Sequence, residues 1–102
     1  MSEIKHIYEM IEFPNQGVLS KTISETKSGE VDIFMLPKGE KISGHTSSRD
    51  AAVMILQGEA NFRLGETWHK VIPGDWFFMD AGLEHELNAL EDLVFILTLF
   101  GG

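Results

Sequence analysis

Glycine-bearing turn signals divide most of this chain into short segments. They recur roughly every seven to twelve residues, the spacing of short strands in a sandwich or barrel. They stand at residues 15–17, 27–30, 37–40, 57–59, 64–66, 73–75 and 80–84. The runs between them read as strands, namely VLSKTIS, VDIFML, AAVMIL, ANFRL, TWHKVI, DWFFM, HELNAL and LVFILTLF. Only residues 4–11 suggest a helical turn, so the chain is expected to be all-β.

Two of these runs, DWFFM (75–79) and LVFILTLF (93–100), are apolar on both faces. One face can line the interior of a barrel, and the other must pack on a second sheet or a partner subunit. The pattern predicts a closed antiparallel β-sandwich or jelly roll. The alternative is an open sandwich of immunoglobulin type, although its Cys–Trp–Cys core is absent here.

The length and charge of the chain narrow the function classes. The 102 residues are enough for one domain, taken as 1–102, and so small a domain covers its core poorly, which favours a homodimer. Eight basic and 16 acidic residues give a net charge of −8, which argues against nucleic acid as a partner. Without cysteine, signal-like start or membrane-length apolar run, the chain is expected to be cytoplasmic and to have no membrane partner.

Two of the four histidines, His45 and His85, share a sequence context. Each follows a glycine-bearing loop and is expected to open a strand. Two histidines entering neighbouring strands at one end of a barrel can point at a common centre, and imidazole is a frequent ligand of transition metals. His69 could face inward and add a third imidazole, or it is simply exposed. His6 is expected at the surface.

The segment 39–89 resembles the cupin superfamily, whose first motif reads G-x5-H-x-H-x3/4-E-x6-G. Gly39, His45 and Gly58 match this motif at the right spacing. Ser47 stands where the motif has its second histidine, and Ala51 stands at the glutamate.

The second motif of that superfamily reads G-x5-P-x-G-x2-H-x3-N. Gly74, Gly82 and His85 match it, whereas Asp80 stands at the proline and Ala89 at the asparagine. The resemblance implies a double-stranded β-helix, that is, a jelly-roll cupin barrel of homodimeric type, whose motif-bearing core is about 39–89.

Metal-binding members of the superfamily use both histidines and the glutamate of the first motif, with the histidine of the second. By that resemblance only His45 and His85 remain as metal ligands, an incomplete set for Zn, Fe, Ni, Mn or Cu. Serine is a poor ligand and alanine is none, whereas a catalytic zinc usually has three protein ligands.

Nearby side chains offer little to complete such a set. Glu84 and Glu86 flank His85, but on a strand they would face the opposite side, and Asp50 has the same problem unless a bulge shifts it. Arg49 could hold a substrate carboxylate or pair with an acid at the surface. Larger apolar side chains are expected in the core, where some could line a cavity: Met35, Met54, Phe62, Trp68, Trp76, Phe77, Phe78, Met79 and Phe95.

Three functions remain open from the sequence. The first is a small-molecule pocket at the barrel mouth around His45, Ser47 and His85, with a weak metal site or none. The second is a metal-dependent enzyme of dioxygenase or isomerase type that uses the two histidines. The third is a metal-free isomerase or epimerase with a histidine as general base. No catalytic residue is assigned, and whether the chain is an enzyme is undecided.

Overall fold

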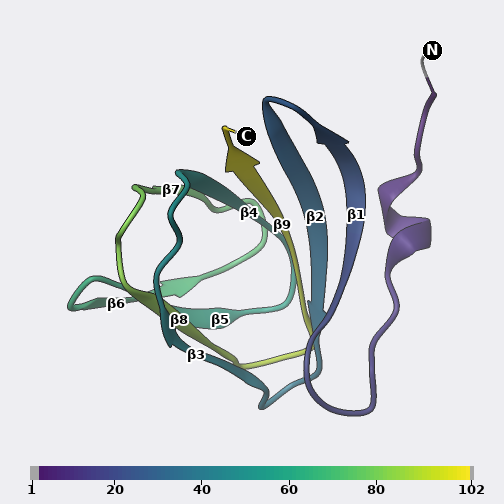
Figure 1. Cartoon of the computed structure of the whole chain (residues 1–102). Coiled ribbons are helices and arrows are strands. Elements are labelled where there is room, and N and C mark those ends of the chain that lie inside the picture. The colour runs from purple at the N-terminus through teal and green to yellow at the C-terminus, as the bar shows by residue number, and fades with distance from the viewer. Residues whose placement is uncertain (1–2, 102) are drawn as a thin grey trace.

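The computed structural model describes residues 3–101, in which nine antiparallel strands form two facing sheets (Figure 1). The five-stranded sheet has the order β1-β2-β9-β4-β7, and the four-stranded sheet has the order β3-β8-β5-β6. The strands are β1 (Leu19–Thr26), β2 (Gly29–Leu36), β3 (Lys41–His45), β4 (Ala51–Gln57), β5 (Ala60–Leu64), β6 (Thr67–Val71), β7 (Trp76–Met79), β8 (His85–Ala89) and β9 (Leu93–Phe100). This is an all-β double-stranded β-helix, as the sequence predicts.

Strand β9 lies at the centre of the larger sheet. It pairs with all eight residues of β2 on one side and with β4 on the other. Since a central strand is covered on both faces, its side chains are apolar at nearly every position. This explains the uninterrupted LVFILTLF run.

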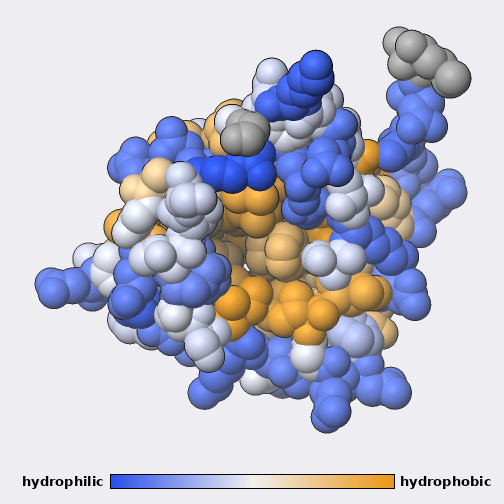
Figure 2. Space-filling model, viewed as in Figure 1, coloured by the Kyte–Doolittle hydropathy of each residue, from blue (hydrophilic) through white to orange (hydrophobic). Residues whose placement is uncertain are grey.

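The main core fills the space between the sheets. Its buried members include Val53, Ile55, Phe62, Leu87 and Phe95, each at most 3% exposed. Viewed from the side shown in Figure 1, the apolar side chains gather in a hollow between the sheets, ringed by polar ones (Figure 2). The inner face of this barrel is therefore where a ligand would meet apolar surface.

A second core cluster lies on the outer face of the larger sheet. Ile33, Met35 and Val94 are fully buried there. They are covered by the N-terminal segment, which contributes Ile7 of the short 3-10 helix η1 (Ile7–Met10) and Phe13 beyond it. Figure 1 shows this segment running alongside β1. The helical turn expected near residues 4–11 is thus present as η1.

That cover does not reach the β7 end of the sheet. Trp76 and Phe78 on β7 are 59% and 43% exposed, and Met54 on β4 is 37% exposed. All three were expected in the core, as was Trp68, which is 46% exposed on β6. The expectation fails because these side chains alternate with inward-facing neighbours and therefore point outward from the barrel.

The structure also corrects one strand boundary. His45 closes β3 instead of opening the strand that leads to β4, which begins at Ala51. The KISGH segment of β3 contains lysine and glycine, which are poor strand formers, yet its pairing with β8 holds it extended. Tertiary contacts here override local propensity. Among the described residues, no helix is long and apolar enough to cross a membrane.

Candidate functional site

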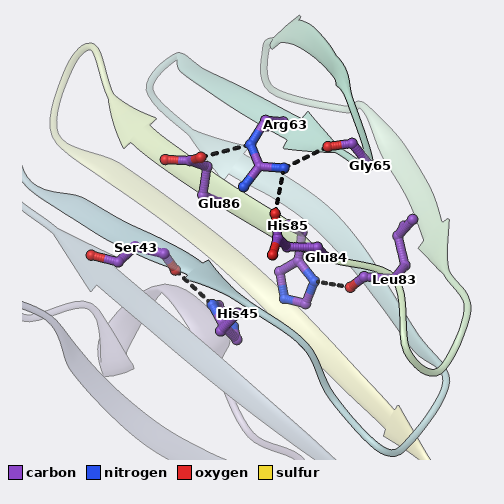
Figure 3. A network of polar contacts seen from close by, with 8 residues as sticks. All are labelled: Ser43, His45, Arg63, Gly65, Leu83, Glu84, His85 and Glu86. Carbon is purple, nitrogen blue, oxygen red and sulfur yellow. Dashed lines mark hydrogen bonds and ion pairs between the residues drawn. The ribbon is translucent and has the colours of Figure 1, made fainter.

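His45 and His85 lie directly opposite each other on the paired strands β3 and β8. Their ring centroids are 4.2 Å apart and the ring planes are inclined at 65°. Figure 3 shows the two rings side by side, one from each strand. The two strongest site predictions from the sequence are thus brought into one place.

A backbone irregularity positions the first of these rings. Residues three apart on a regular strand point to opposite faces, but the pairing of β3 with β8 shifts between Ile42 and His45. The side chains of Ile42 and His45 therefore both face the interior. On β8 no shift is needed, because His85 and Leu87 are two residues apart and share a face.

Each imidazole is held by a backbone carbonyl two residues earlier. The Nδ1 atom of His45 lies 2.8 Å from the carbonyl oxygen of Ser43, and that of His85 lies 2.9 Å from the carbonyl oxygen of Leu83. A carbonyl only accepts, so each Nδ1 carries the proton and donates. In the neutral rings both Nε2 atoms consequently keep a free lone pair, which can accept a hydrogen bond or bind a metal.

The two rings differ in burial. His85 is 8% exposed, whereas His45 is exposed at the mouth. Burial is the main reason that the pKa of His85 lies below its ordinary value; the charges of His45 and Arg63 lower it further, and the carbonyl of Leu83 opposes them. His85 is therefore a neutral acceptor at pH 7.

Both histidines line a cavity of about 60 Å³ between the sheets. That volume is several times the roughly 10–15 Å³ needed by one water, but far below the ~300 Å³ of a pocket for a drug-sized ligand. The rest of its wall is apolar: Phe34, Ile42, Val53, Phe62, Met79, Leu87, Phe95 and Leu97. A few polar groups on an otherwise apolar wall are typical of a site that orients a small ligand.

The third residue predicted for the pocket, Ser47, lies in the loop after β3 and does not line this cavity. Its hydroxyl accepts a hydrogen bond from the backbone N–H of Arg49, at 3.1 Å. Its carbonyl accepts one from the N–H of Gly82, at 2.8 Å. Ser47 thus fastens the β3–β4 loop to the turn before β8.

The side chains of Arg49 and Asp50 likewise form hydrogen bonds that link the β3–β4 loop to the backbone of other segments. The guanidinium of Arg49 donates to the carbonyl oxygens of Phe100 and Gly101 at the end of β9. The carboxylate of Asp50 accepts the N–H of Ala81, at 2.8 Å. Neither of the two roles considered for Arg49, a substrate carboxylate or an acidic partner, matches these contacts.

A polar network lies behind the histidines, on the outer face of the smaller sheet (Figure 3). Arg63 on β5 contacts Glu86 at 2.6 Å and Glu84 at 3.0 Å, and it donates to the carbonyl oxygen of Gly65. The bond to Glu86 is the main reason that the pKa of Arg63 is raised. The two glutamates that flank His85 therefore face away from it, as their strand parity predicts.

His69 does share the inward face of its strand, being paired with Phe62. It lines a different pocket of about 270 Å³, however, and Phe62 forms part of the wall of both. Within residues 3–101 no group of three or more histidine, cysteine or acidic side chains could hold a metal ion. His6 is exposed near the N-terminus.

Sequence reasoning missed Asp32 on β2. Its side chain is buried, at 7% exposure, and its Oδ1 atom makes no hydrogen bond with any described residue. The signal was present, since Asp32 is the one charged residue in the apolar run VDIFML. Charged residues are rarely buried without a partner.

The motif glycines are required by backbone geometry. Gly58 has φ of 80°, and a Cβ placed there would lie 2.2 Å from the carbonyl oxygen of Asp92. Gly39, Gly74 and Gly82 also have positive φ, a region that only glycine enters readily.

Comparisons with known proteins agree with this architecture. A family model described as the cupin domain matches residues 32–99. A conserved protein of unknown function from Streptococcus pyogenes is 26% identical with a TM-score of 0.86, over 100% of this chain and 90% of that one.

Two other solved structures share the fold at 20% identity and a TM-score of 0.88. One is a cupin superfamily protein from Desulfitobacterium hafniense, matched over 100% of this chain and 94% of that one. The other is an uncharacterized protein with a double-stranded β-helix domain from Klebsiella pneumoniae, matched over 100% and 92%. No curated protein matches the chain.

Proposed function

Because this chain belongs to the cupin domain family, we propose that it binds a small molecule in the cavity between its two sheets, with His45 and His85 as the recognising side chains. One observation carries this proposal. Two fixed imidazoles with free Nε2 lone pairs stand on an otherwise apolar wall. Such a pair accepts hydrogen bonds from a ligand whose body fits the apolar surface.

A tight metal site fits these residues poorly. The cavity offers two imidazoles, one ligand fewer than a catalytic zinc usually has, and the described residues supply no third. Any metal held here would need water or the ligand to complete its coordination. The proposed function is therefore a binding module with a weak metal site or none.

Two enzymatic functions each have one observation in their favour. The carbonyl contacts at both Nδ1 atoms orient the rings as in metal-binding histidines, which favours a metal-dependent enzyme. The lowered pKa of His85 keeps its ring neutral at pH 7, which favours a metal-free isomerase or epimerase with that ring as general base.

The test compares two double variants of untagged protein. His45→Ala/His85→Ala removes the pair, and His6→Ala/His69→Ala removes two exposed histidines outside the cavity. Metal content and thermal shifts with a panel of small metabolites are measured for each. We expect metal well below one per chain in wild type, and ligand-induced shifts that only the first variant loses.

Other outcomes would redirect the proposal. Metal near one per chain, lost only in the first variant, would favour the metal-dependent enzyme. Exchange of a substrate carbon-bound proton in metal-free protein would favour the isomerase. Ligand shifts that persist in His45→Ala/His85→Ala would contradict the pocket altogether.

A further inference from the structure

Asp32 lies at the border of the histidine cavity without belonging to its wall. It shares the inner face of β2 with Phe34, two residues further along. On the neighbouring strand β9 it is paired with Leu97. Phe34 and Leu97 both line the cavity, so Asp32 is the next inward-facing residue of β2 beyond the cavity wall.

The side chain of Asp32 is buried but incompletely bonded. It is 7% exposed, and Oδ1 makes no hydrogen bond within residues 3–101. No lysine or arginine of that part of the chain forms an ion pair with it; the ion pairs there involve Lys5, Lys21, Arg63 and Lys70 with glutamates. A buried carboxylate oxygen without a donor is costly, so a hydrogen-bond donor that reaches Oδ1 would be bound favourably.

The neighbouring acidic side chain does not satisfy this need. Glu30 is on the same face of β2, and Glu25 lies opposite it on β1. The pKa of Glu30 is raised to about 7, mainly by its hydrogen bond with Asp32 and then by the charge of that carboxylate. Near neutral pH Glu30 is therefore partly protonated, and Oδ1 of Asp32 still has no donor within residues 3–101.

We propose that Asp32 anchors the positively charged end of the bound small molecule, so that the ligand of this pocket is a small ammonium compound with an apolar body. This inference rests on the proposed function, because it assigns the chemical class of the same ligand.

The polar groups around the cavity point to that class. His45 and His85 present acceptor lone pairs, and Asp32 presents an acceptor oxygen, so the ligand must supply donors. An ammonium group supplies three donors and a positive charge. The net charge of −8 also attracts cations and repels anions. Asp32 and the histidines do not form a group of three that could hold a metal, which favours an extended organic cation.

The test uses three probes with the same carbon chain: n-butylammonium, n-butanol and butyrate. Their dissociation constants are measured from amide chemical shifts of the labelled protein. Wild type is compared with Asp32→Asn, which keeps the shape and removes the charge, and with Glu66→Gln, a control in the exposed β5–β6 turn that changes net charge equally. The shifts of Phe34 and Leu97 report the site.

We expect n-butylammonium to bind wild type and Glu66→Gln at least about tenfold more tightly than n-butanol, since a bond to a charged group contributes that much. Asp32→Asn should lose this preference, and butyrate should not bind. Equal binding of the two probes, unchanged affinity in Asp32→Asn, or no ammonium binding would each overturn the inference. Water would then be the partner of Oδ1.

Two further measurements separate the possible failures. Binding of n-butanol that His45→Ala/His85→Ala abolishes, without any ammonium preference, would leave the proposed pocket intact and remove only the role of Asp32. If Asp32→Asn does not fold, the carboxyl carbon shift of Asp32 in wild type is followed instead. It should move on addition of n-butylammonium, and an unmoved resonance would count against the proposal.

Discussion

His85 couples the site to pH, because its ring is buried and its pKa lies below the ordinary value. In the unfolded chain that histidine titrates near ~6.5. Between the two pKa values the unfolded chain binds the proton more readily, so the free energy of unfolding rises with pH in that window. Its contribution is complete above the unfolded pKa and declines as the pH falls below it.

Between pH 8 and 5 the raised pKa of Glu30 has the opposite effect on the free energy of unfolding, and it acts equally in wild type and in a His85 variant. As the pH is lowered over this range, we therefore expect the urea midpoint of His85→Gln to rise relative to that of wild type, because the variant lacks the buried ring that resists protonation. His69→Gln removes an exposed histidine and serves as the matched control. Identical slopes in wild type and His85→Gln would contradict the role of burial.

Gly58 is the glycine least able to accept a side chain. Its φ of 80° disfavours any other residue, and a Cβ would lie 2.2 Å from a backbone oxygen. Gly58→Ala should lower the free energy of unfolding by about 2 kcal/mol or more, because strain and a backbone clash add.

Gly39→Ala is the matched control for that substitution. Gly39 has φ of 90°, but a Cβ there meets no atom within 4 Å. The Gly39→Ala variant therefore has the backbone strain without the clash, and urea unfolding should show a smaller loss of unfolding free energy than in Gly58→Ala. Equal losses of unfolding free energy in Gly58→Ala and Gly39→Ala would mean that the clash between a Cβ at position 58 and the carbonyl oxygen of Asp92 contributes nothing.

At the scale of the strands, Phe62 on β5 separates the two pockets, because its ring forms part of the wall of both. This ring packs edge-on against Phe77 and Phe95, with centroids 4.9 and 5.8 Å away, and it is 1% exposed. Phe62→Ala should cost about 3–5 kcal/mol in the free energy of unfolding and should join the histidine cavity to the His69 pocket.

Chemical denaturation and binding of a small apolar probe test this prediction. Trp68→Ala, on the outer face of the adjacent strand, is the control and should cost less, because that ring is 46% exposed. An unchanged probe affinity in Phe62→Ala would show that Phe62 does not separate the pockets.

The strands differ in how well the sequence predicts them. The run LVFILTLF coincides with β9, and AAVMIL with most of β4, because a buried strand needs apolar residues at nearly every position. Strand β3 was missed, since KISGH has little strand propensity and is extended by pairing with β8. Short strands held by their neighbours leave only a weak local pattern.

The sequence predicted only those residues of the candidate site that lie at motif positions. His45 and His85 were found from their spacing to glycines, whose turns the fold requires. Asp32 belongs to a strand outside both motifs, and its place beside the cavity depends on the pairing of β2 with β9. Such long-range pairing has no signature within a single segment of sequence.

On the scale of the whole molecule, we propose that the chain forms a homodimer through the part of the larger sheet's outer face that the N-terminal segment leaves uncovered. Met54, Trp76, Phe78 and Phe100 are exposed there, and the rings of Phe78 and Phe100 are 6.0 Å apart. Clustered exposed aromatic residues are typical of interaction surfaces. We call these four residues the aromatic face.

Light scattering after size exclusion tests that proposal. Trp76→Ser/Phe78→Ser should weaken dimerisation at least about tenfold, since buried aromatic residues dominate such interfaces. Trp68→Ser, on the other sheet, should leave it unchanged. Because each copy carries a charge of −8, association should strengthen as salt screens the repulsion. A wild type that stays monomeric at high salt would contradict the proposal.

The central place of β9 has a consequence for how this protein is made. Its residues leave the ribosome after those of the eight other strands, yet β2 and β4 both pair with it. Until then the nascent chain carries two apolar strands whose hydrogen-bonding edges are open, a state prone to aggregation. The larger sheet is therefore completed only after β9 has been translated. Before that point the nascent chain is most prone to aggregate, and it is then that binding by chaperones would matter most.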